Sequence, residues 1–308
     1  MDEIKYMRVS LTTDCNKSCW YCFNEGQTYE IKTLEDIDGF KWFIKQMVIN
    51  YSTQLVRFTG GEPLMHPAAI KMVHITKTAG VKKVGITTNG VLVEKHIDKL
   101  AEHGLDSCAV HLCHLDEQQK ANLQLVTNQM TTLVNRFART RFNVVLVKSN
   151  FLRVEELIGH IADRGIKIQI LDLLRTDRIR KVKFEEEYCE LNSLHKKLRR
   201  HDFKKTNENK NVKIFRRDRT IIKLVEHYAN LGLQKSYCTR QLAYNPILLT
   251  PDFHLSYCTH FNKPTYSISD AVSNQDVLML RDVIQRMKQD AVACTACSDR
   301  VVLEDLKY

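Results

Sequence analysis

Long apolar runs are missing from this sequence. No stretch of its 308 residues approaches the roughly 20 apolar residues that a membrane-spanning helix needs. The first ten residues, MDEIKYMRVS, contain no apolar core of the kind that signal peptides carry. We therefore expect no membrane partner, no export and a cytoplasmic location.

The missing export signal bears on the ten cysteines of the chain. Disulfides persist in oxidising compartments and are rare in the cytosol, so a disulfide framework is not expected. Clustered thiols in a reducing compartment are expected to bind metal or to take part in catalysis.

Lysine and arginine outnumber acidic residues, and the formal net charge is +10. A basic balance favours anionic partners such as phosphates or nucleic acid. A solvated basic surface is the alternative explanation. We favour an anionic substrate.

Apolar strand patterns alternate with helical patterns from residue 7 to residue 174, and no internal repeat is visible. The predicted strands are 7–13, 54–63, 82–90, 107–115, 142–150 and 167–174. The predicted helices are 33–50, 67–79, 93–103, 117–138 and 153–164, the first opening with a capping box of Thr33 and Asp36. This alternation predicts a parallel sheet covered by helices, with strands apolar on both faces, as in a barrel or a doubly wound sheet.

The unusual segments all follow predicted strands. They are the cysteine loop after the first strand, "TGGEP" (59–63), "TTNG" (87–90) and "HLCHL" (111–115). Ligands of such folds bind at the carboxyl ends of the strands. The four segments therefore predict one ligand site on one rim of the sheet.

The cysteine loop has the spacing C-x3-C-x2-C, formed by Cys15, Cys19 and Cys22. Iron–sulfur clusters are normally held by four thiolates. Three thiolates leave one iron without a protein ligand, and an open metal position can bind substrate. Structural cysteines or a partial zinc knuckle are the alternative, which the position of the loop before "TGGEP" makes less attractive.

These motifs together resemble the signature of the radical S-adenosylmethionine (SAM) superfamily. The cysteine loop, with Tyr21 before its third cysteine, is similar to the family's cluster loop. The resemblance implies a [4Fe–4S] cluster held by Cys15, Cys19 and Cys22, with SAM on the open iron and Tyr21 near its adenine.

"TGGEP" resembles the glycine-rich segment that binds the methionine part of SAM. Gly60 and Gly61 permit close backbone approach, and Glu62 offers a carboxylate to the SAM ammonium group. The resemblance also implies that Thr88 and Asn89 of "TTNG" line the same cofactor. The expected fold is then an α/β partial (β/α)6 TIM barrel with a small C-terminal auxiliary-cluster domain.

Residues 5–175 are similar to the GTP cyclases of molybdenum-cofactor biosynthesis, notably at "GLDSCAVHLCHLDEQ" (104–118). His111 takes the place of a family serine that contacts the cofactor ribose. It can hydrogen-bond a hydroxyl, but it can equally be a core residue. Pro246 and Leu248 replace two family arginines, and the chain ends "LEDLKY" without the family's double glycine. These departures argue against GTP cyclase activity itself.

Four further cysteines stand near the C-terminus, namely Cys238, Cys258, Cys294 and Cys297. Four thiols are the full complement for a second [4Fe–4S] cluster, and the segment resembles the auxiliary-cluster (twitch or SPASM-like) domains of the superfamily. A structural zinc site is the alternative. "NPILLTPDFHLSYC" (245–258) predicts a hairpin that turns at Pro251 and Asp252, and 277–289 a helix.

The expected organisation has three parts: a radical SAM barrel (1–175), a basic helical connector (176–235) and an auxiliary iron–sulfur domain (236–308). In the connector, Leu191, Leu194 and Leu198 form one narrow helical stripe. A solvated connector is the preferred interpretation, and a lid or an anion-binding surface is the alternative.

The remaining cysteines, Cys108, Cys113 and Cys189, are expected to be buried thiols. Cys113 follows a strand end, so it is the one that could reach substrate and is a candidate catalytic residue.

The resemblance implies reductive cleavage of SAM to a 5′-deoxyadenosyl radical, with a reductant such as flavodoxin or ferredoxin, and hydrogen abstraction from a substrate. A small anionic, nucleotide- or sugar-like substrate fits the basic balance and the cyclase likeness. A ribosomally made peptide is the alternative. The chain starts at its first strand with no added peptide-recognition domain, which favours the small molecule.

A non-enzymatic zinc or nucleic-acid binding protein is a third hypothesis from another class. The net charge supports it, but it leaves "TGGEP" and "TTNG" unexplained. We therefore do not expect a nucleic-acid partner.

Overall fold

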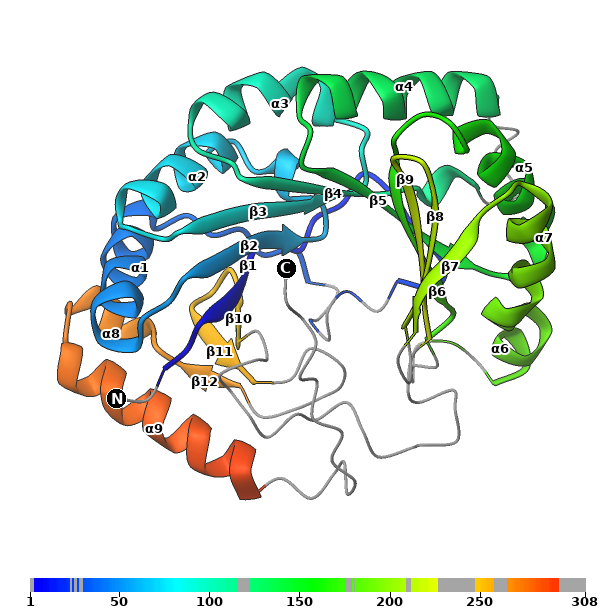
Figure 1. The fold of residues 1–308 in the computed structure, drawn as a ribbon. Helices are drawn as coiled ribbons and strands as arrows, with labels where there is room; N and C mark the ends of the chain where they lie inside the picture. The colour runs from blue at the N-terminus through cyan, green and yellow to red at the C-terminus, as the bar shows by residue number, and fades with distance from the viewer. Residues whose placement is uncertain are drawn as a thin grey trace.

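The computed structural model describes residues 3–22, 24, 27, 30–115, 122–174, 179, 181–208, 212–226, 247–257 and 265–293. These residues form one sheet of 12 strands that curves into an open barrel, with helices on its convex side (Figure 1). The predicted α/β partial barrel is confirmed.

A central block of parallel strands is extended at both edges by antiparallel hairpins. In sheet order the strands are β12 (Tyr266–Ser267), β11 (His254–Ser256), β10 (Ile247–Leu249), β1 (Tyr6–Thr12), β2 (Leu55–Gly60), β3 (Lys83–Thr88), β4 (Ser107–His111), β5 (Thr140–Leu146), β6 (Lys167–Asp172), β9 (Thr220–Val225), β8 (Val212–Arg217) and β7 (Lys204–Glu208). The parallel block runs from β10 to β9, so it exceeds the six predicted strands at both ends.

All five predicted helices between these strands are present: α1 (Ile37–Tyr51), α2 (Ala69–Thr78), α3 (Val93–Glu102), α4 (Leu123–Arg136) and α5 (Phe151–Ile161). The predicted start of the first helix is wrong. Asp36 caps α1 by accepting a hydrogen bond from the Gly39 backbone N–H at 2.8 Å. Thr33 lies outside the helix, where its hydroxyl lies 3.1 Å from the hydroxyl of Thr12.

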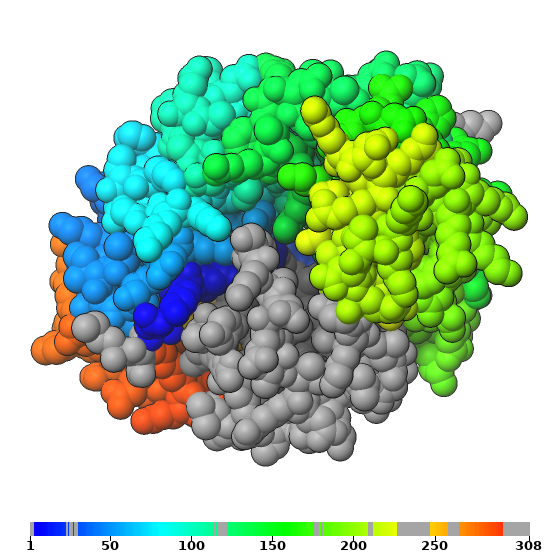
Figure 2. Space-filling model, viewed as in Figure 1, coloured from blue at the N-terminus to red at the C-terminus, as the bar shows by residue number. Residues whose placement is uncertain are grey.

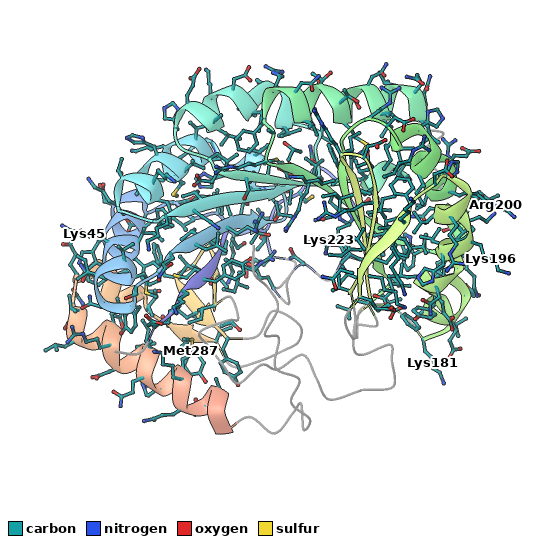
Figure 3. The ribbon with its side chains drawn as sticks, viewed as in Figure 1. Lys45, Lys181, Lys196, Arg200, Lys223 and Met287 are labelled. Carbon is teal, nitrogen blue, oxygen red and sulfur yellow. The ribbon has the colours of Figure 1, made fainter. Side chains whose placement is uncertain are left out.

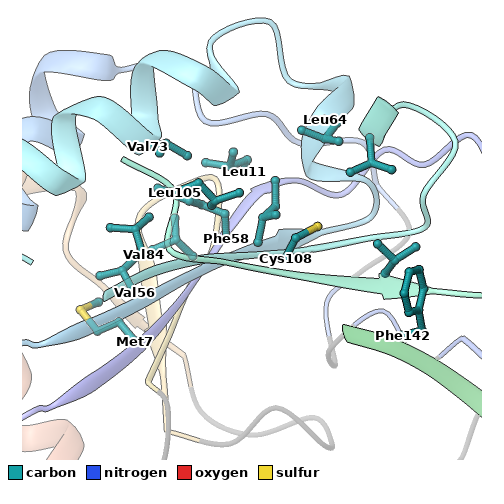
Figure 4. Packing of buried hydrophobic residues seen from close by; sticks show 14 of the residues in the cluster. Met7, Leu11, Val56, Phe58, Leu64, Val73, Val84, Leu105, Cys108 and Phe142 are labelled. Carbon is teal, nitrogen blue, oxygen red and sulfur yellow. The ribbon is translucent and has the colours of Figure 1, made fainter. Parts of the chain in front are cut away.

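The convex face of the sheet is apolar and carries the core. Val56, Phe58, Val84 and Phe142 are fully buried there, and Figure 4 shows them packed with side chains beneath the covering helices. Burying a side chain of this size stabilises the fold by about 1.5–3 kcal/mol. The convex face is therefore what holds the helices to the sheet.

The expectation that the strands are apolar on both faces is wrong. In β5 buried and half-buried residues alternate, and the half-buried ones include Arg141 and Asn143. We call the concave side of the sheet, which faces the inside of the barrel, the lumen; it carries polar side chains as well as apolar ones.

Residues 181–225 differ in part from the predicted helical connector. The predicted leucine stripe is confirmed, because Leu191, Leu194 and Leu198 are buried. These leucines lie in a 3-10 turn, η5 (Leu191–Leu194), and in the helix that continues it, α7 (His195–Arg200). A short helix, α6 (Lys181–Glu187), precedes them. The next segment forms β7, β8 and β9 instead of helix, because β9 finds a parallel partner in β6.

The predicted C-terminal hairpin is confirmed, with β10 antiparallel to β11 and Pro251 and Asp252 between them. It joins the barrel through β10, which runs parallel to β1. Two helices follow, α8 (Ser269–Ser273) and the predicted C-terminal helix α9 (Val277–Ala293). In Figure 2 the orange surface of these helices lies at the lower left of the molecule and the yellow-green surface that includes β7–β9 lies at the right.

Cys238, Cys258, Cys294, Cys297 and Pro246 lie outside the described residues. The three-part division of the chain stays a prediction. No helix in the described part of the chain has the length and apolar character needed to cross a membrane.

Candidate functional site

The cysteine loop leaves the carboxyl end of β1. Cys15 and Cys19 are half-buried and Cys22 is exposed. A turn brings the Cys22 backbone N–H to the Cys19 carbonyl at 3.0 Å. The three thiols therefore share one short loop on the rim, as the sequence predicts.

The two glycines at the end of β2, Gly60 and Gly61, permit close contact between this loop and the sheet. Gly60 has φ +136°, and a Cβ there would lie 2.1 Å from the Thr12 carbonyl oxygen. A Cβ on Gly61 would lie equally close to the carbonyl oxygen of Asp14. The Gly61 N–H donates to the Thr12 carbonyl at 2.8 Å. In this structure the glycines thus permit close approach of the cysteine loop; their predicted approach to SAM stays a prediction.

Glu62 joins the ends of β2 and β3. Its carboxylate is fully buried and accepts hydrogen bonds from the Thr88 hydroxyl at 2.7 Å and the Asn89 backbone N–H at 2.6 Å. The Leu64 N–H donates a third, at 3.1 Å. Burial raises the pKa of Glu62, and these three donors partly oppose the rise.

Asn89 connects the end of β3 to the cysteine loop. Its side-chain NH₂ group donates to the Asn16 side-chain oxygen at 2.6 Å and lies 3.7 Å from the Cys15 sulfur. The motif that follows β3 thus contacts the loop that follows β1. "TGGEP" and "TTNG" meet the cysteine loop at one place, as their positions after neighbouring parallel strands predict.

Tyr21 carries the loop across the rim to the far side of the barrel. Its ring is buried beside Val147 and Leu173, which lie just beyond β5 and β6. Its hydroxyl lies 3.4 Å from Nε2 of His111, at the end of β4. His111 is half-buried, so it is neither a core residue nor fully open to solvent.

The segment of α6 lies against the same loop. Lys183 Nζ lies 5.3 Å from the centre of the Trp20 ring, within the range of a cation–π contact. Phe184 and Tyr188 pack on the cluster that contains Tyr21. The cysteine loop is therefore contacted from β2, β3, β4 and α6.

The donor set fits an iron–sulfur cluster. One short loop carries the three thiols, and two of them have N–H donors nearby: Asn24 N–H lies 3.4 Å from the Cys22 sulfur and the Asn89 side-chain NH₂ lies 3.7 Å from the Cys15 sulfur. Hydrogen bonds to cluster sulfurs are a usual means of tuning such sites. Burial raises the pKa of the Cys15 thiol, while hydrogen bonds from Lys17 and Asn89 lower it. Among the described residues, no three His, Cys, Asp or Glu side chains surround a position for a single metal ion.

The other described cysteines are Cys108, Cys113 and Cys189. Cys108 is buried on the convex face, where burial raises its pKa to about 12, so its prediction as a buried thiol is confirmed. Cys189 is only half-buried. Cys113 is half-buried, and its sulfur lies 3.8 Å from the His111 carbonyl. Its catalytic role stays a prediction.

The polar concave face of β5, β6 and β9 was not predicted. Asn143, Gln169 and Lys223 alternate there with buried Val144, Ile170 and Leu224. "KIQILD" shows a partial period-two pattern, but "FNVVLV" and "TIIKLV" do not alternate, so there was little local signal for this face. Asn16, the partner of Asn89, carried no such signal.

Comparison with known families identifies the chain. The model of the radical SAM superfamily matches residues 9–183, which is more than half of the sequence. The chain belongs to the radical SAM superfamily. Membership implies a [4Fe–4S] cluster and SAM as cofactors, and it makes this chain an enzyme.

Several curated proteins to which the chain is similar carry the name GTP 3′,8-cyclase. The GTP 3′,8-cyclase of Chlorobaculum tepidum is 37% identical over 117 residues, which cover 38% of this chain and 35% of that protein. A probable GTP 3′,8-cyclase of Sulfurisphaera tokodaii is 28% identical over 279 residues, covering 87% of this chain and 85% of the relative. The match to the first thus spans about a third of that relative's length.

Among solved structures, SuiB of Streptococcus suis has a similar fold. The TM-score is 0.63 at 12% sequence identity, and the match covers 95% of this chain and 68% of SuiB. At this identity the likeness concerns the fold alone.

Proposed function

We propose that this radical SAM enzyme cleaves SAM reductively and abstracts a hydrogen atom from a small anionic, nucleotide- or sugar-like substrate in the lumen. The observation that carries the proposal is the cysteine loop, fixed by the ends of β2 and β3 above a polar lumen. A reductant such as flavodoxin or ferredoxin supplies the electron.

When bound, the [4Fe–4S] cluster and SAM would supply the chemistry of reductive SAM cleavage and hydrogen abstraction. Cys15, Cys19 and Cys22 would hold the cluster. Asn89 orients Cys15 through its hydrogen bond. Glu62 keeps the Thr88–Asn89 backbone in place, and its carboxylate is our candidate partner for the SAM ammonium group.

Tyr21 and His111 lie where the cysteine loop meets the end of β4. The apolar neighbours of Tyr21 exclude water from its side of the loop. Excluding water protects a reactive radical from side reactions. The protein's task is to place the substrate hydrogen beside this loop.

The relatives named GTP 3′,8-cyclase support a nucleotide-like substrate. Leu248, which stands where the cyclases carry an arginine, is buried in β10, paired in register with Arg8 of β1. An aliphatic side chain cannot donate hydrogen bonds to a purine. We therefore propose a nucleotide-like substrate other than GTP, or another product.

The test is an anaerobic incubation of reconstituted enzyme with SAM and dithionite, plus pools of nucleotides, sugar phosphates or peptides. We expect 5′-deoxyadenosine formation to rise with a nucleotide or sugar-phosphate pool, and GTP to give no cyclised product. No SAM cleavage under any condition would overturn the proposal. If only the peptide pool increases 5′-deoxyadenosine formation, the substrate is a peptide and not a small molecule.

We propose a second cluster on Cys238, Cys258, Cys294 and Cys297. The support is their number, since four thiolates complete a [4Fe–4S] site, and the hairpin between Cys238 and Cys294 joins the barrel at β1. Metal analysis of a variant lacking Cys15, Cys19 and Cys22 tests this. About four irons per chain are expected; zinc, or no metal, would refute the cluster.

A further inference from the structure

One layer of the lumen runs from the cysteine loop to β9. Strand register pairs His111 with Asn143, Asn143 with Gln169, and Gln169 with Lys223. Paired residues of parallel strands share a face, so these four side chains line one row. Tyr21 stands at the near end through its contact with His111.

Lys223 stands at the far end of this row without a partner. Among the described residues, it makes no hydrogen bond and no ion pair. Figure 3 shows Lys223 on the concave side of the sheet, whereas Lys181, Lys196 and Arg200 point outward from their helices. An ammonium group in this position is available to a ligand in the lumen.

The surroundings of Lys223 are cationic. Register places Arg141, Lys167 and Arg216 on the same face of β5, β6 and β8. In the described parts of β5, β6, β8 and β9, this face carries no carboxylate. Partial burial and these three neighbouring charges lower the pKa of Lys223. Like charges gathered on one face create a local potential that attracts an anion.

The middle of the row also has unused hydrogen-bonding groups. The side-chain oxygen of Asn143 is buried without a hydrogen-bond partner in the described structure. The Gln169 amide, half-buried beside it, likewise makes no side-chain hydrogen bond to any described residue. Buried polar groups are normally paired, so this pattern indicates that a ligand completes it.

We propose that Lys223 binds the anionic group of the substrate, a phosphate or a carboxylate, while Gln169 and Asn143 bond its uncharged polar part. This inference rests on the proposed function and adds a specificity-determining residue to it. Three strand spacings separate His111 from Lys223, about 14 Å. A substrate that reaches from Lys223 to the loop is therefore about as long as a nucleotide.

The test measures binding of tripolyphosphate and citrate to the anaerobically reconstituted enzyme by calorimetry. The variants are Lys223→Gln, which removes the charge, and Lys223→Arg, which keeps it. Lys196→Gln, on the exposed outer side of α7, removes one equal charge elsewhere and is the matched control. We expect Lys223→Gln to weaken binding of one probe by about tenfold, in keeping with a lost charge-assisted hydrogen bond.

Lys223→Arg should restore most of the affinity, and Lys196→Gln should leave it unchanged. A loss confined to tripolyphosphate identifies a phosphate group, and a loss confined to citrate a carboxylate. No saturable binding to the wild type, or equal losses in Lys223→Gln and Lys196→Gln, would overturn the inference.

SAM cleavage by the same preparations separates the two proposals. Cleavage with unchanged probe affinity in Lys223→Gln would refute the anion site and leave the proposed function standing. If Lys223→Gln binds the probe more weakly but the wild type does not cleave SAM, the proposed function would be refuted and the anion site would stand.

Discussion

The polar side chains in the two halves of the barrel differ in how many hydrogen-bond partners they have within the chain. At the ends of β1, β2 and β3, Glu62 and Asn89 each make several hydrogen bonds within the chain. On the concave face of β5, β6 and β9, Lys223 and the amides of Asn143 and Gln169 have no partners among the described residues. One half is a finished support for the cysteine loop, and the other has groups left for a ligand.

This difference separates two tasks in one fold. Holding a cluster requires a loop whose backbone is fixed before any ligand arrives, because misplaced reacting groups lose rate steeply. Choosing a substrate requires groups that are satisfied only when the right molecule is present. Changes in the first half should therefore remove all SAM chemistry, and changes in the second should alter only substrate affinity.

The largest expected effect comes from replacing Cys15, Cys19 and Cys22 together by alanine. The variant should form no 5′-deoxyadenosine, because the cluster loses all its protein ligands in this loop, while circular dichroism should remain that of the folded protein. Cys189→Ala, outside the loop, is the control and should retain activity. SAM cleavage by the triple variant would contradict the assignment of the loop.

The next effect tests the fit between the loop and the sheet. Gly61→Ala places a methyl group against the carbonyl oxygen of Asp14, which cannot yield without moving the loop. We expect the cluster to be lost or SAM cleavage to fall by tenfold or more, on the scale of a small misplacement of reacting groups. Gly159→Ala, where the added carbon meets only the His201 side chain, is the control. Equal activity in both variants would mean that the loop is not held by this contact.

Glu62→Ala tests the bonds that join β2 to β3. It leaves the Thr88 hydroxyl and the Asn89 N–H buried without acceptors, so the free energy of unfolding should fall by about 3 kcal/mol. Urea denaturation measures this, with exposed Glu102→Ala as control. Burial raises the pKa of Glu62 in the folded protein above its ordinary value of 4.5. Its contribution to the free energy of unfolding is therefore complete below pH 4.5 and declines as the pH rises through the folded-state pKa. The deficit of the variant should therefore be larger in acid than at neutral pH; the opposite trend would contradict the burial argument.

The smallest effect concerns the contact between the C-terminal hairpin and the segment that precedes α1. Asp252 pairs with Lys32 at 2.8 Å. Burial alone would raise the pKa of Asp252, but hydrogen bonds from Lys32 and Thr250 lower it below 3.8. The Asp252 charge therefore contributes to the free energy of unfolding above pH 3.8, and this contribution is lost as the pH falls through the folded-state pKa. Asp252→Asn should lower the free energy of unfolding by less than about 1 kcal/mol at neutral pH, since the pair is partly exposed.

In a pH series of unfolding measurements, the difference between Asp252→Asn and the wild type should disappear below that pKa. Asp282→Asn, on the exposed side of α9, is the control. A difference that persists in acid would show that the Asp252 charge is not its cause.

Local signals predicted much of the fold and of the finished half of the site. Alternating strand and helix patterns placed the six strands from β1 to β6, and neighbouring parallel strands necessarily bring "TGGEP" and "TTNG" to the cysteine loop. The hairpin at Pro251 and Asp252 was equally local. The use of the glycines to seat the cysteine loop could not be foreseen, because it depends on the separation of two backbones.

The sequence did not predict that β9 and β10 join the sheet, because each pairs with a strand that is distant in the sequence. β10 pairs with β1, more than 200 residues away in the sequence. β9 pairs with β6, although α6, η5, α7, β7 and β8 lie between them in the sequence. Short strands such as "TIIKLV" carry too few residues for their pattern to outweigh a basic, helix-like context. The inward position of Lys223 follows from that pairing and from nothing local.

The most direct test of the account is the electron paramagnetic resonance spectrum of the reduced enzyme with and without SAM. SAM labelled with ¹⁵N at its amino group should change the cluster signal and show a nitrogen coupling to it, because the loop of Cys15, Cys19 and Cys22 leaves one iron for SAM. The triple alanine variant should lack this response. A wild-type cluster signal that SAM leaves unchanged would contradict the account.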